Sequence, residues 1–457
     1  MEGVKVVVIG GGSSYTPELA DGIIKRYSTF PVRELVLVDI DAGRKKVEIV
    51  SNLIRRMFTA SGINIPVSYT LNRRSALKGA DFVVSQIRVG GLEARARDES
   101  IPLKYGIIGQ ETTGPGGFAN ALRTIPVVMD ICRDMENLCP EAWLINFTNP
   151  SGIITEAVLG HSSVRCLGLC NIPINMANTA AGVFGVDRSK VNCRIAGLNH
   201  LSFMDSLLID GNERLQEFII AVSSEIKAKN ISGADIPGDF LGILGLIPTP
   251  YLRYYFLEKQ TVAEETAKLE STGKTRAGEV MEIEQKLFDI YSNESLVKKP
   301  EELSKRGGAL YSEAAVELMD SIFNDRKDIQ VVNTMNNGCI SELPNNAIVE
   351  TNCIIGRNGA QPLKTGLLPL AVRGLVQQVK AYEQLTIEAA IDGCRDKALL
   401  ALINNPLVHD VATAKSLLDD ILTANKDYLE LFFREELRYG LFWGNRRRGK
   451  QDPLRYR

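Results

Sequence analysis

A cysteine and a histidine thirty positions apart are the residues of this chain best suited to metal chemistry. Cys170 ends a strand-like segment, and His200 closes the stretch Gly197-Leu198-Asn199-His200. A thiolate and an imidazole both bind first-row metals, and two protein ligands leave positions open for substrate and water. Such a site suits Mn, Ni, Co or Fe(II), and the spacing does not choose among them. The same two residues could also be a buried cysteine and a hydrogen-bonded histidine.

A glycine-rich turn near the N-terminus is a second candidate site. Gly10, Gly12 and Ser13 follow an apolar strand-like run and precede a helical pattern. Glycines in this position let a pyrophosphate approach the N–H groups at a helix N-terminus. The third glycine of the usual fingerprint is replaced by Tyr15, so the turn alone is a weak signal. Asp39 ends the next strand-like segment, where an acid accepts from a ribose 2′-OH and repels a 2′-phosphate. Together these residues predict binding of NAD rather than NADP.

The elements that must position these residues alternate between strand and helix over the first 200 residues. Strands are expected at 5–10, 34–40, 81–88, 142–147 and 164–170, with helices at 17–27 and 43–58. Thr16 before Pro17 is the expected N-cap of the first helix. This alternation is typical of a Rossmann-type, doubly wound parallel sheet.

Beyond about residue 200 the alternation weakens, and long helical patterns follow at 262–292, 310–323, 366–404 and 411–435. We therefore predict an α/β fold in three parts. An NAD-binding Rossmann-like domain occupies residues 1–200, and a helix-rich α+β domain for substrate binding and oligomerisation occupies 201–440. Residues 441–457 form a basic, poorly ordered tail.

Composition narrows the class of partner. The chain has 457 residues, of which 45% are hydrophobic and 24% charged, as in a globular protein with a full core. A net charge of -2 argues against nucleic acid, which requires a basic face. No apolar run approaches the ~20 residues of a membrane span, and no leader-like pattern precedes the first strand. The eight cysteines form no C-x-x-C pair, so we expect a cytoplasmic enzyme that acts on small metabolites.

Several polar, glycine-rich segments occur in a fixed order along the chain. They are 10–18, 109–117, 146–150, 168–173 and 197–200. Together they resemble the motifs of glycoside hydrolase family 4, and more narrowly those of its members that act on 6-phospho-β-glucosides. The resemblance runs from residue 4 to about residue 435. It implies hydrolysis of phosphorylated cellobiose-type disaccharides and aryl β-glucosides.

The resemblance implies a mechanism that differs from hydrolysis by paired carboxylates. NAD oxidises the C3 hydroxyl of the sugar, and a base then removes the acidified C2 proton. A divalent metal, expected to be Mn and held by Cys170 and His200, stabilises the enediolate. The aglycone leaves by elimination, water adds at C1, and the hydride returns to C3. NAD is therefore recycled without net redox change.

Further site residues are assigned by the same resemblance. Tyr251 is the implied base, and Glu111 matches an acid that helps to make this tyrosine basic. A free tyrosine titrates near ~10, so it needs activation. Without the resemblance, Tyr251 is a buried aromatic of an amphipathic helix.

The phosphate requires donors, and arginine offers forked ones. Arg88, Arg95 and Arg276 are the candidates, while Arg95 and Asn149 match substrate-contacting positions of the family. The resemblance also favours a homodimer or homotetramer.

The residue after the metal cysteine bears on the linkage that is cleaved. Family members that act on α-linked substrates tend to carry an acid there, whereas this chain has Asn171. An amide cannot protonate a leaving alkoxide, so β-linked substrates are favoured and the general acid is left open. A 6-phospho-α-glycosidase is the alternative within the family.

Two alternatives come from other classes. An NAD-dependent 2-hydroxyacid dehydrogenase could use His200 with an arginine, although Cys170 would then have no role. A non-catalytic NAD-sensing protein would bind the cofactor without metal-dependent turnover.

Overall fold

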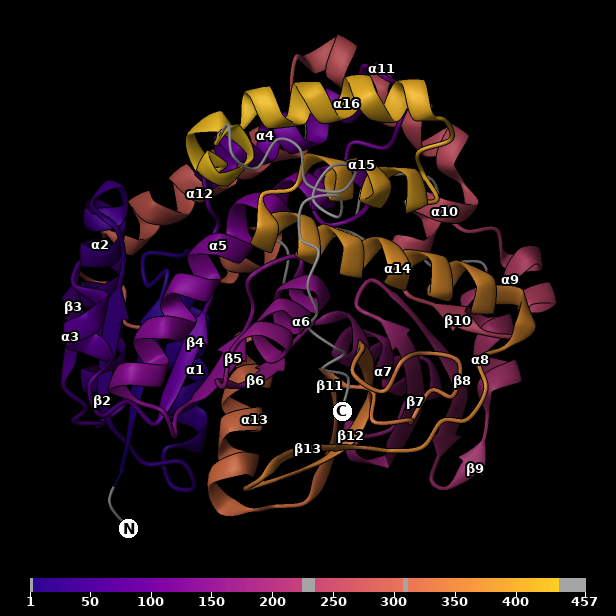
Figure 1. Cartoon of the computed structure of the whole chain (residues 1–457). Coiled ribbons are helices and arrows are strands. Elements are labelled where there is room, and N and C mark those ends of the chain that lie inside the picture. The colour runs from indigo at the N-terminus through magenta and orange to yellow at the C-terminus, as the bar shows by residue number, and fades with distance from the viewer. Residues whose placement is uncertain (1–2, 224–234, 307–310, 435–457) are drawn as a thin grey trace, which may run out of the picture.

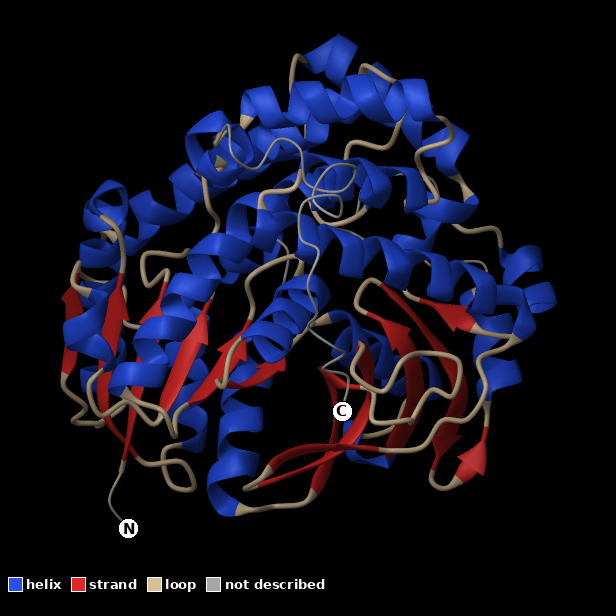
Figure 2. Ribbon diagram, in the orientation of Figure 1, coloured by secondary structure: helices blue, strands red, loops and turns tan. Residues whose placement is uncertain are grey.

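The computed structural model describes residues 3–223, 235–306 and 311–434 of the chain. Within these ranges thirteen strands form one sheet, and helices pack against it (Figure 1, Figure 2). Alternate residues of β1 (Val4–Ile9) point to opposite faces of the sheet. Val7 belongs to one apolar core, and Val6 and Val8 belong to the other. A sheet buried on both faces in this way reads as a continuous apolar run, as the sequence does at 6–9.

Six parallel strands form the first half of the sheet, in the spatial order β3-β2-β1-β4-β5-β6. This is the strand order of a dinucleotide-binding Rossmann sheet, so the predicted fold class is confirmed. The strands are β1 (Val4–Ile9), β2 (Val32–Val38), β3 (Val67–Thr70), β4 (Phe82–Ser85), β5 (Trp143–Asn146) and β6 (Arg165–Gly168). The helices of this half are α1 (Thr16–Arg26), α2 (Arg44–Ala60), α3 (Arg73–Leu77), α4 (Gly91–Leu103), α5 (Gly114–Leu138), α6 (Ser151–His161) and α7 (Ile172–Phe184).

Antiparallel strands continue the same sheet beyond β6. They are β7 (Val191–Leu198), β8 (Leu201–Ile209), β9 (Asn212–Glu213), β10 (Ile247–Pro248), β11 (Asp328–Met335), β12 (Ile348–Gly356) and β13 (Gly359–Pro362). β11 pairs with β6, and β12 lies between β11 and β7. The predicted division at residue 200 therefore falls in the turn of the β7–β8 hairpin, inside one continuous sheet.

Helices dominate the rest of the second half, as predicted. They are α8 (Leu215–Val222), α9 (Gly238–Leu244), α10 (Arg253–Phe256), α11 (Glu258–Thr272), α12 (Arg276–Tyr291), α13 (Tyr311–Asn324), α14 (Leu370–Asp392), α15 (Arg395–Asn404) and α16 (Val411–Ala424). Short 3-10 helices occupy 41–43, 188–190, 250–252, 301–306, 426–428 and 430–433. None of the helices in the described ranges is both long and apolar enough to cross a bilayer.

Three predicted element boundaries were wrong. The long helical patterns at 262–292 and 366–404 are each divided into two helices, because Gly273 (φ +66°) and Gly393 (φ +63°) end the first of each pair in the left-handed region. Thr16 is not an N-cap but the first residue of α1. Its hydroxyl donates to the Gly11 carbonyl (3.0 Å). The predicted tail at 441–457 lies outside the described residues.

Candidate active site

A cavity of about 1720 Å³ lies along the carboxyl ends of the parallel strands. Cofactor sites of doubly wound sheets form at this edge. Every site residue predicted from the sequence except Cys170 lines it: Gly10, Gly12, Ser13, Asp39, Arg88, Arg95, Glu111, Asn149, Asn171, His200, Tyr251 and Arg276. The chain therefore brings the glycine turn, the histidine, the tyrosine and the arginines to one place.

The glycine turn joins β1 to α1 and is fixed by an acid from the next strand. Gly10 has φ +85°, and a Cβ there would lie 2.8 Å from the Gln86 carbonyl oxygen. A Cβ on Gly12 would lie 2.7 Å from Oδ2 of Asp39, which accepts the Gly12 N–H at 2.7 Å. Both glycines are therefore required on steric grounds. This bare backbone before a helix, with a carboxylate beside it, fits the pyrophosphate and ribose of a dinucleotide.

Cys170 lies two residues beyond β6 and two residues before the start of α7, and it is buried. Burial raises the pKa of its thiol, and the charge of Glu350 raises it further. The N–H groups of Ile172 and Asn171 and the amide of Asn199 lower this pKa, because they bond to the sulfur. Donors aimed at the sulfur favour its anionic form, which is the form that binds a metal.

His200 occupies the turn between β7 and β8 with a φ of 65°. Burial lowers the pKa of its imidazole to about 3. The ring is therefore neutral, and its unprotonated nitrogen can coordinate a metal. A neutral imidazole and a thiol that accepts hydrogen bonds are both suitable ligands for a two-ligand metal site. In the ranges 3–223, 235–306 and 311–434 no group of three or more His, Cys, Asp or Glu forms a metal cluster.

Tyr251 lies directly on the histidine. It belongs to the 3-10 helix at 250–252, and its ring stacks on the His200 ring with 3.8 Å between centroids and 10° between planes. Burial raises the pKa of Tyr251, and the charges of Cys170 and Glu111 also raise it. Arg95 acts in the opposite direction. The phenol therefore needs additional positive charge before it can act as a base.

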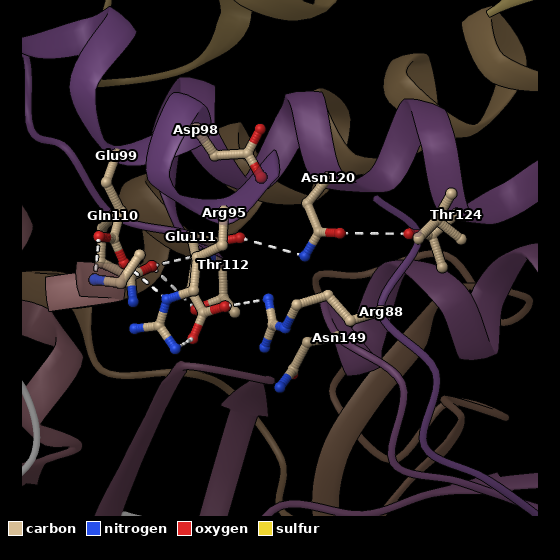
Figure 3. Close-up of polar contacts among 12 residues, drawn as sticks. Arg88, Arg95, Asp98, Glu99, Gln110, Glu111, Thr112, Asn120, Thr124 and Asn149 are labelled. Carbon is tan, nitrogen blue, oxygen red and sulfur yellow. Dashed lines mark hydrogen bonds and ion pairs between the residues drawn. The ribbon is translucent and has the colours of Figure 1, made fainter. Parts of the chain in front are cut away.

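The arginines are held by two buried carboxylates (Figure 3). Glu111 accepts from Arg88 through one oxygen and from Nη1 of Arg95 through the other, at 2.8 Å for the latter. Arg95 Nε donates to Glu99 at 2.7 Å, and the second oxygen of Glu99 accepts the N–H of Ala277 at the start of α12 (2.7 Å). Although burial acts against it, Arg88 and Arg95 hold the pKa of Glu111 below its ordinary value.

Glu111 acts on the arginines as well as on Tyr251. Its carboxylate holds Arg88 and Arg95, and its negative charge raises the pKa of Tyr251. Loss of the phenol proton is thereby made harder rather than easier. A higher pKa also makes the tyrosinate a stronger base once the proton has left, so the role of Glu111 in making Tyr251 basic stays a prediction.

The remaining predicted residues come from three separate elements. Asn149 lies in the loop after β5, where its Oδ1 accepts the Ser151 N–H at 3.3 Å. Asn171 directly precedes α7. Arg276 opens α12 and donates through Nη1 to Glu279 at 2.7 Å.

Sequence reasoning missed Arg306, which also lines the cavity. Its guanidinium lies 5.1 Å above the Tyr15 ring, and its Nη1 donates to the Tyr15 hydroxyl at 3.3 Å. Arg306 also helps to lower the pKa of Glu111. The available signal was Tyr15 itself, since an aromatic side chain in place of the third fingerprint glycine calls for a partner.

Comparison with known proteins agrees with this geometry. Residues 5–186 match the family model of family 4 glycosyl hydrolases, and residues 195–408 match that of the family 4 glycosyl hydrolase C-terminal domain. The chain belongs to glycoside hydrolase family 4. A probable 6-phospho-β-glucosidase of Bacillus subtilis is 50% identical over 438 residues, which cover 95% of this chain and 99% of that protein. The 6-phospho-β-glucosidase of Escherichia coli is 43% identical and covers 94% of this chain and 97% of its own length.

A solved structure is similar over the same length. The 6-phospho-β-glucosidase of Thermotoga maritima, determined with manganese, NAD+ and glucose-6-phosphate, superposes with a TM-score of 0.86 at 39% identity. The match covers 93% of this chain and 99% of that one. The likeness therefore includes both the Rossmann half and the antiparallel half of the sheet.

Proposed function

We propose that the chain is a 6-phospho-β-glucosidase that depends on NAD and a divalent metal, with Mn as the expected ion. Its reaction is oxidation, elimination, addition and reduction, with no net redox change. The observation that carries the proposal is the single cavity shared by the glycine turn, His200, Tyr251 and the arginines. The names of relatives at 50% and 43% identity support the substrate class.

The division of labour follows from position. When bound, NAD supplies a reversible hydride acceptor, and a divalent metal supplies a positive charge that stabilises anionic oxygens. The backbone at Gly10 and Gly12 receives the pyrophosphate, and Asp39 receives the ribose hydroxyl. Cys170 and His200 hold the metal, because they supply a thiolate and a neutral imidazole.

Tyr251 takes the C2 proton of the sugar. Its stacking on His200 fixes the ring. Arg95 lowers the pKa of this phenol, whereas Cys170 and Glu111 raise it, so the divalent metal would supply the further positive charge that ionisation of the phenol needs.

The phosphate is bound by the arginines and the sugar by Asn149. Glu111 and Glu99 hold Arg95 rigidly, so its guanidinium loses little freedom on binding. Arg88 and Arg276 complete the set of forked donors. Asn171 orients the metal or the sugar. Its amide cannot donate a proton to the leaving group, and this favours β-linked substrates.

The test is hydrolysis of p-nitrophenyl-β-D-glucoside 6-phosphate by enzyme stripped of metal and nucleotide under reducing conditions. NAD and Mn²⁺ are restored separately and together. We expect release of nitrophenol only when both are present, without accumulation of NADH. Activity with neither addition would contradict the mechanism, and cleavage of only the α-linked analogue would contradict the linkage. Net NADH formation would favour a dehydrogenase.

Location and assembly are also proposals. All eight cysteines are unpaired, as a reducing cytoplasm favours. We keep a homodimer or homotetramer as the assembly, because large apolar side chains such as Ile220 (73% exposed) and Ile243 (82% exposed) remain on the surface. Light scattering after size-exclusion chromatography measures the assembly, and a monomeric mass would contradict this proposal.

A further inference from the structure

A buried row of residues crosses the sheet between the strands that carry the two proposed metal ligands. In register, each opposite the next, the row consists of Gly168 (β6), Asn333 (β11), Glu350 (β12), Gly197 (β7) and Ser202 (β8). Cys170 lies two residues beyond the first member, and His200 lies two residues before the last. The antiparallel strands β11 and β12 therefore set how far apart the two ligands lie (Figure 1).

Glu350 is the acidic member of this row, and it accepts hydrogen bonds from both sides of the turn that bears His200. It is 1% exposed. Its Oε1 accepts from Nδ2 of Asn199 at 2.9 Å, and its Oε2 accepts from the Ser202 hydroxyl at 2.7 Å. These two donors flank His200 on either side. A left-handed φ of 65° is unfavourable for a residue with a Cβ, so the two anchors help to hold the turn in this conformation.

Asn199 connects the same carboxylate to the cysteine. Its amide bonds to Cys170 as well as to Glu350, and its Oδ1 accepts the Gly152 N–H at 3.4 Å. One amide nitrogen carries two N–H groups, so it can serve both partners. Asn199 thus spans from one proposed ligand to the carboxylate while adjoining the other ligand in the chain.

Packing alone does not explain a carboxylate in this position. Burial raises the pKa of Glu350, and the hydrogen bonds from Ser202 and Asn199 act against that rise. A well-packed apolar side chain of similar volume is often at least as stable as a buried charge. The cost of burying this carboxylate is explained if its hydrogen bonds fix the positions of Asn199 and Ser202.

We propose that Glu350 is a positioning residue, which fixes the spacing of Cys170 and His200 through Asn199 and Ser202 and thereby sets the metal affinity. The inference rests on the proposed metal-dependent function. Partners behind metal ligands commonly change metal affinity by about 10–100-fold when they are removed.

The test is Mn²⁺ binding to metal-free protein, followed by the paramagnetic resonance signal of the free ion, with NAD affinity measured alongside. Glu350→Leu removes both acceptors, and we expect about 10–100-fold weaker Mn²⁺ binding with NAD affinity within about twofold of wild type. Glu350→Gln keeps an acceptor for Asn199, and the serine hydroxyl can turn to accept from the new amide. It should therefore bind Mn²⁺ within about fivefold of wild type.

Two further variants make the result decisive. Ser202→Ala leaves the carboxylate in place and removes one anchor, so a loss of about fivefold is expected even if Glu350→Leu fails to fold. Asp320→Asn is the matched control. Asp320 is a carboxylate with 1% exposure on α13, bound to Asn324 (2.6 Å) and Arg326 (2.7 Å). Its replacement should change neither affinity.

The outcomes separate this inference from the proposed function. If wild type binds Mn²⁺ no better than Cys170→Ser, the metal site itself is wrong and the inference falls with it. If Cys170→Ser loses binding while Glu350→Leu and Ser202→Ala keep it, only the role of Glu350 is wrong. Equal losses in Glu350→Leu and Glu350→Gln would assign the effect to charge and overturn positioning by hydrogen bonds.

Discussion

Tyr251 is the residue whose chemistry depends most on its neighbours, because its half-buried ring stacks on His200 and desolvation raises its pKa. If it removes the C2 proton, Tyr251→Phe should lower kcat by about 10²–10⁴-fold, the usual contribution of a positioned general base. NAD affinity should stay within about threefold, since the glycine turn is untouched. Steady-state assays with NAD and Mn²⁺ present measure the rate, and titration measures the affinity.

A matched tyrosine makes this prediction specific. The Tyr105 hydroxyl bonds to Asp420 at 3.0 Å, and Tyr105 is not among the residues that line the cavity. Tyr105→Phe should therefore leave kcat unchanged. A kcat for Tyr251→Phe within tenfold of wild type would remove this tyrosine from the list of bases.

Individual site residues differed in how far the sequence could predict them. The glycine turn and Asp39 were accessible from a local pattern, because the motif spans one strand, one turn and one helix. The pairing of Cys170 with His200 rested on resemblance to a family. Glu350 follows His200 by 150 residues and meets its turn only through the register of β12 with β7, which no local pattern encodes.

At the scale of elements, α4 and α5 are joined by an ion pair that is closed to water. Asp98 and Arg123 each have fully buried side chains, and two of their hydrogen bonds measure 2.6 and 2.7 Å. Asp98→Asn leaves the guanidinium without its counter-charge, so the free energy of unfolding should fall by about 3–5 kcal/mol. Urea denaturation measures it.

An exposed pair provides the comparison for that variant. Glu141 pairs with Arg165, and their side chains are 81% and 47% exposed. Glu141→Gln should cost less than about 1 kcal/mol, because water already screens both charges. If the two variants lost the same stability, the α4–α5 pair would not be a strong contributor.

A second group of buried charges links α14 to α6 and makes stability depend on pH. Lys380 bonds to both Glu383 and Glu156. Burial raises the pKa of Glu383 from 4.5 to about 7, against the effect of Lys380. Between these values the folded chain binds more protons than the unfolded chain, so the free energy of unfolding falls as pH rises.

Replacing Glu383 with glutamine removes the titrating carboxyl group and tests its effect on stability. In Glu383→Gln the fall between about pH 5 and about pH 8 should be smaller than in wild type, by at most about 3 kcal/mol. Denaturation at both pH values measures the difference, and Glu141→Gln should follow wild type. Parallel curves for wild type and Glu383→Gln would show that Glu383 titrates normally.

Among the elements, the parallel strands were predicted better than the antiparallel ones. β1, β2 and β4 are apolar because both of their faces are buried. β11 and β12 carry Asn333, Glu350 and Thr351 at fully or nearly fully buried positions, which hides the periodicity that marks a strand. The buried polar residues that the proposed site needs on β11 and β12 are also the reason why the sequence did not reveal these two strands.

At the scale of the whole molecule, the Rossmann half depends on residues supplied late in the chain. Val316, Leu318 and Met319 of α13 are fully buried in the same core as Leu19 and Ile23 of α1. From α12, the Tyr291 hydroxyl donates to the Ser14 carbonyl at 2.8 Å. The two halves of the chain are therefore expected to fold together, although they contribute different parts of the site.

A fragment that ends at residue 209 tests this dependence, because it keeps all six parallel strands and the β7–β8 hairpin. It loses the α13 side chains and leaves the β6 edge without β11. Three buried apolar side chains at about 2 kcal/mol each amount to about 6 kcal/mol, which is comparable with the net stability of a typical domain, about 5–15 kcal/mol. Calorimetry should therefore find no cooperative unfolding transition in the fragment, with the full-length chain as reference. A sharp transition together with NAD binding by the fragment would mean that the first half folds by itself, and that α13 only covers a core already formed.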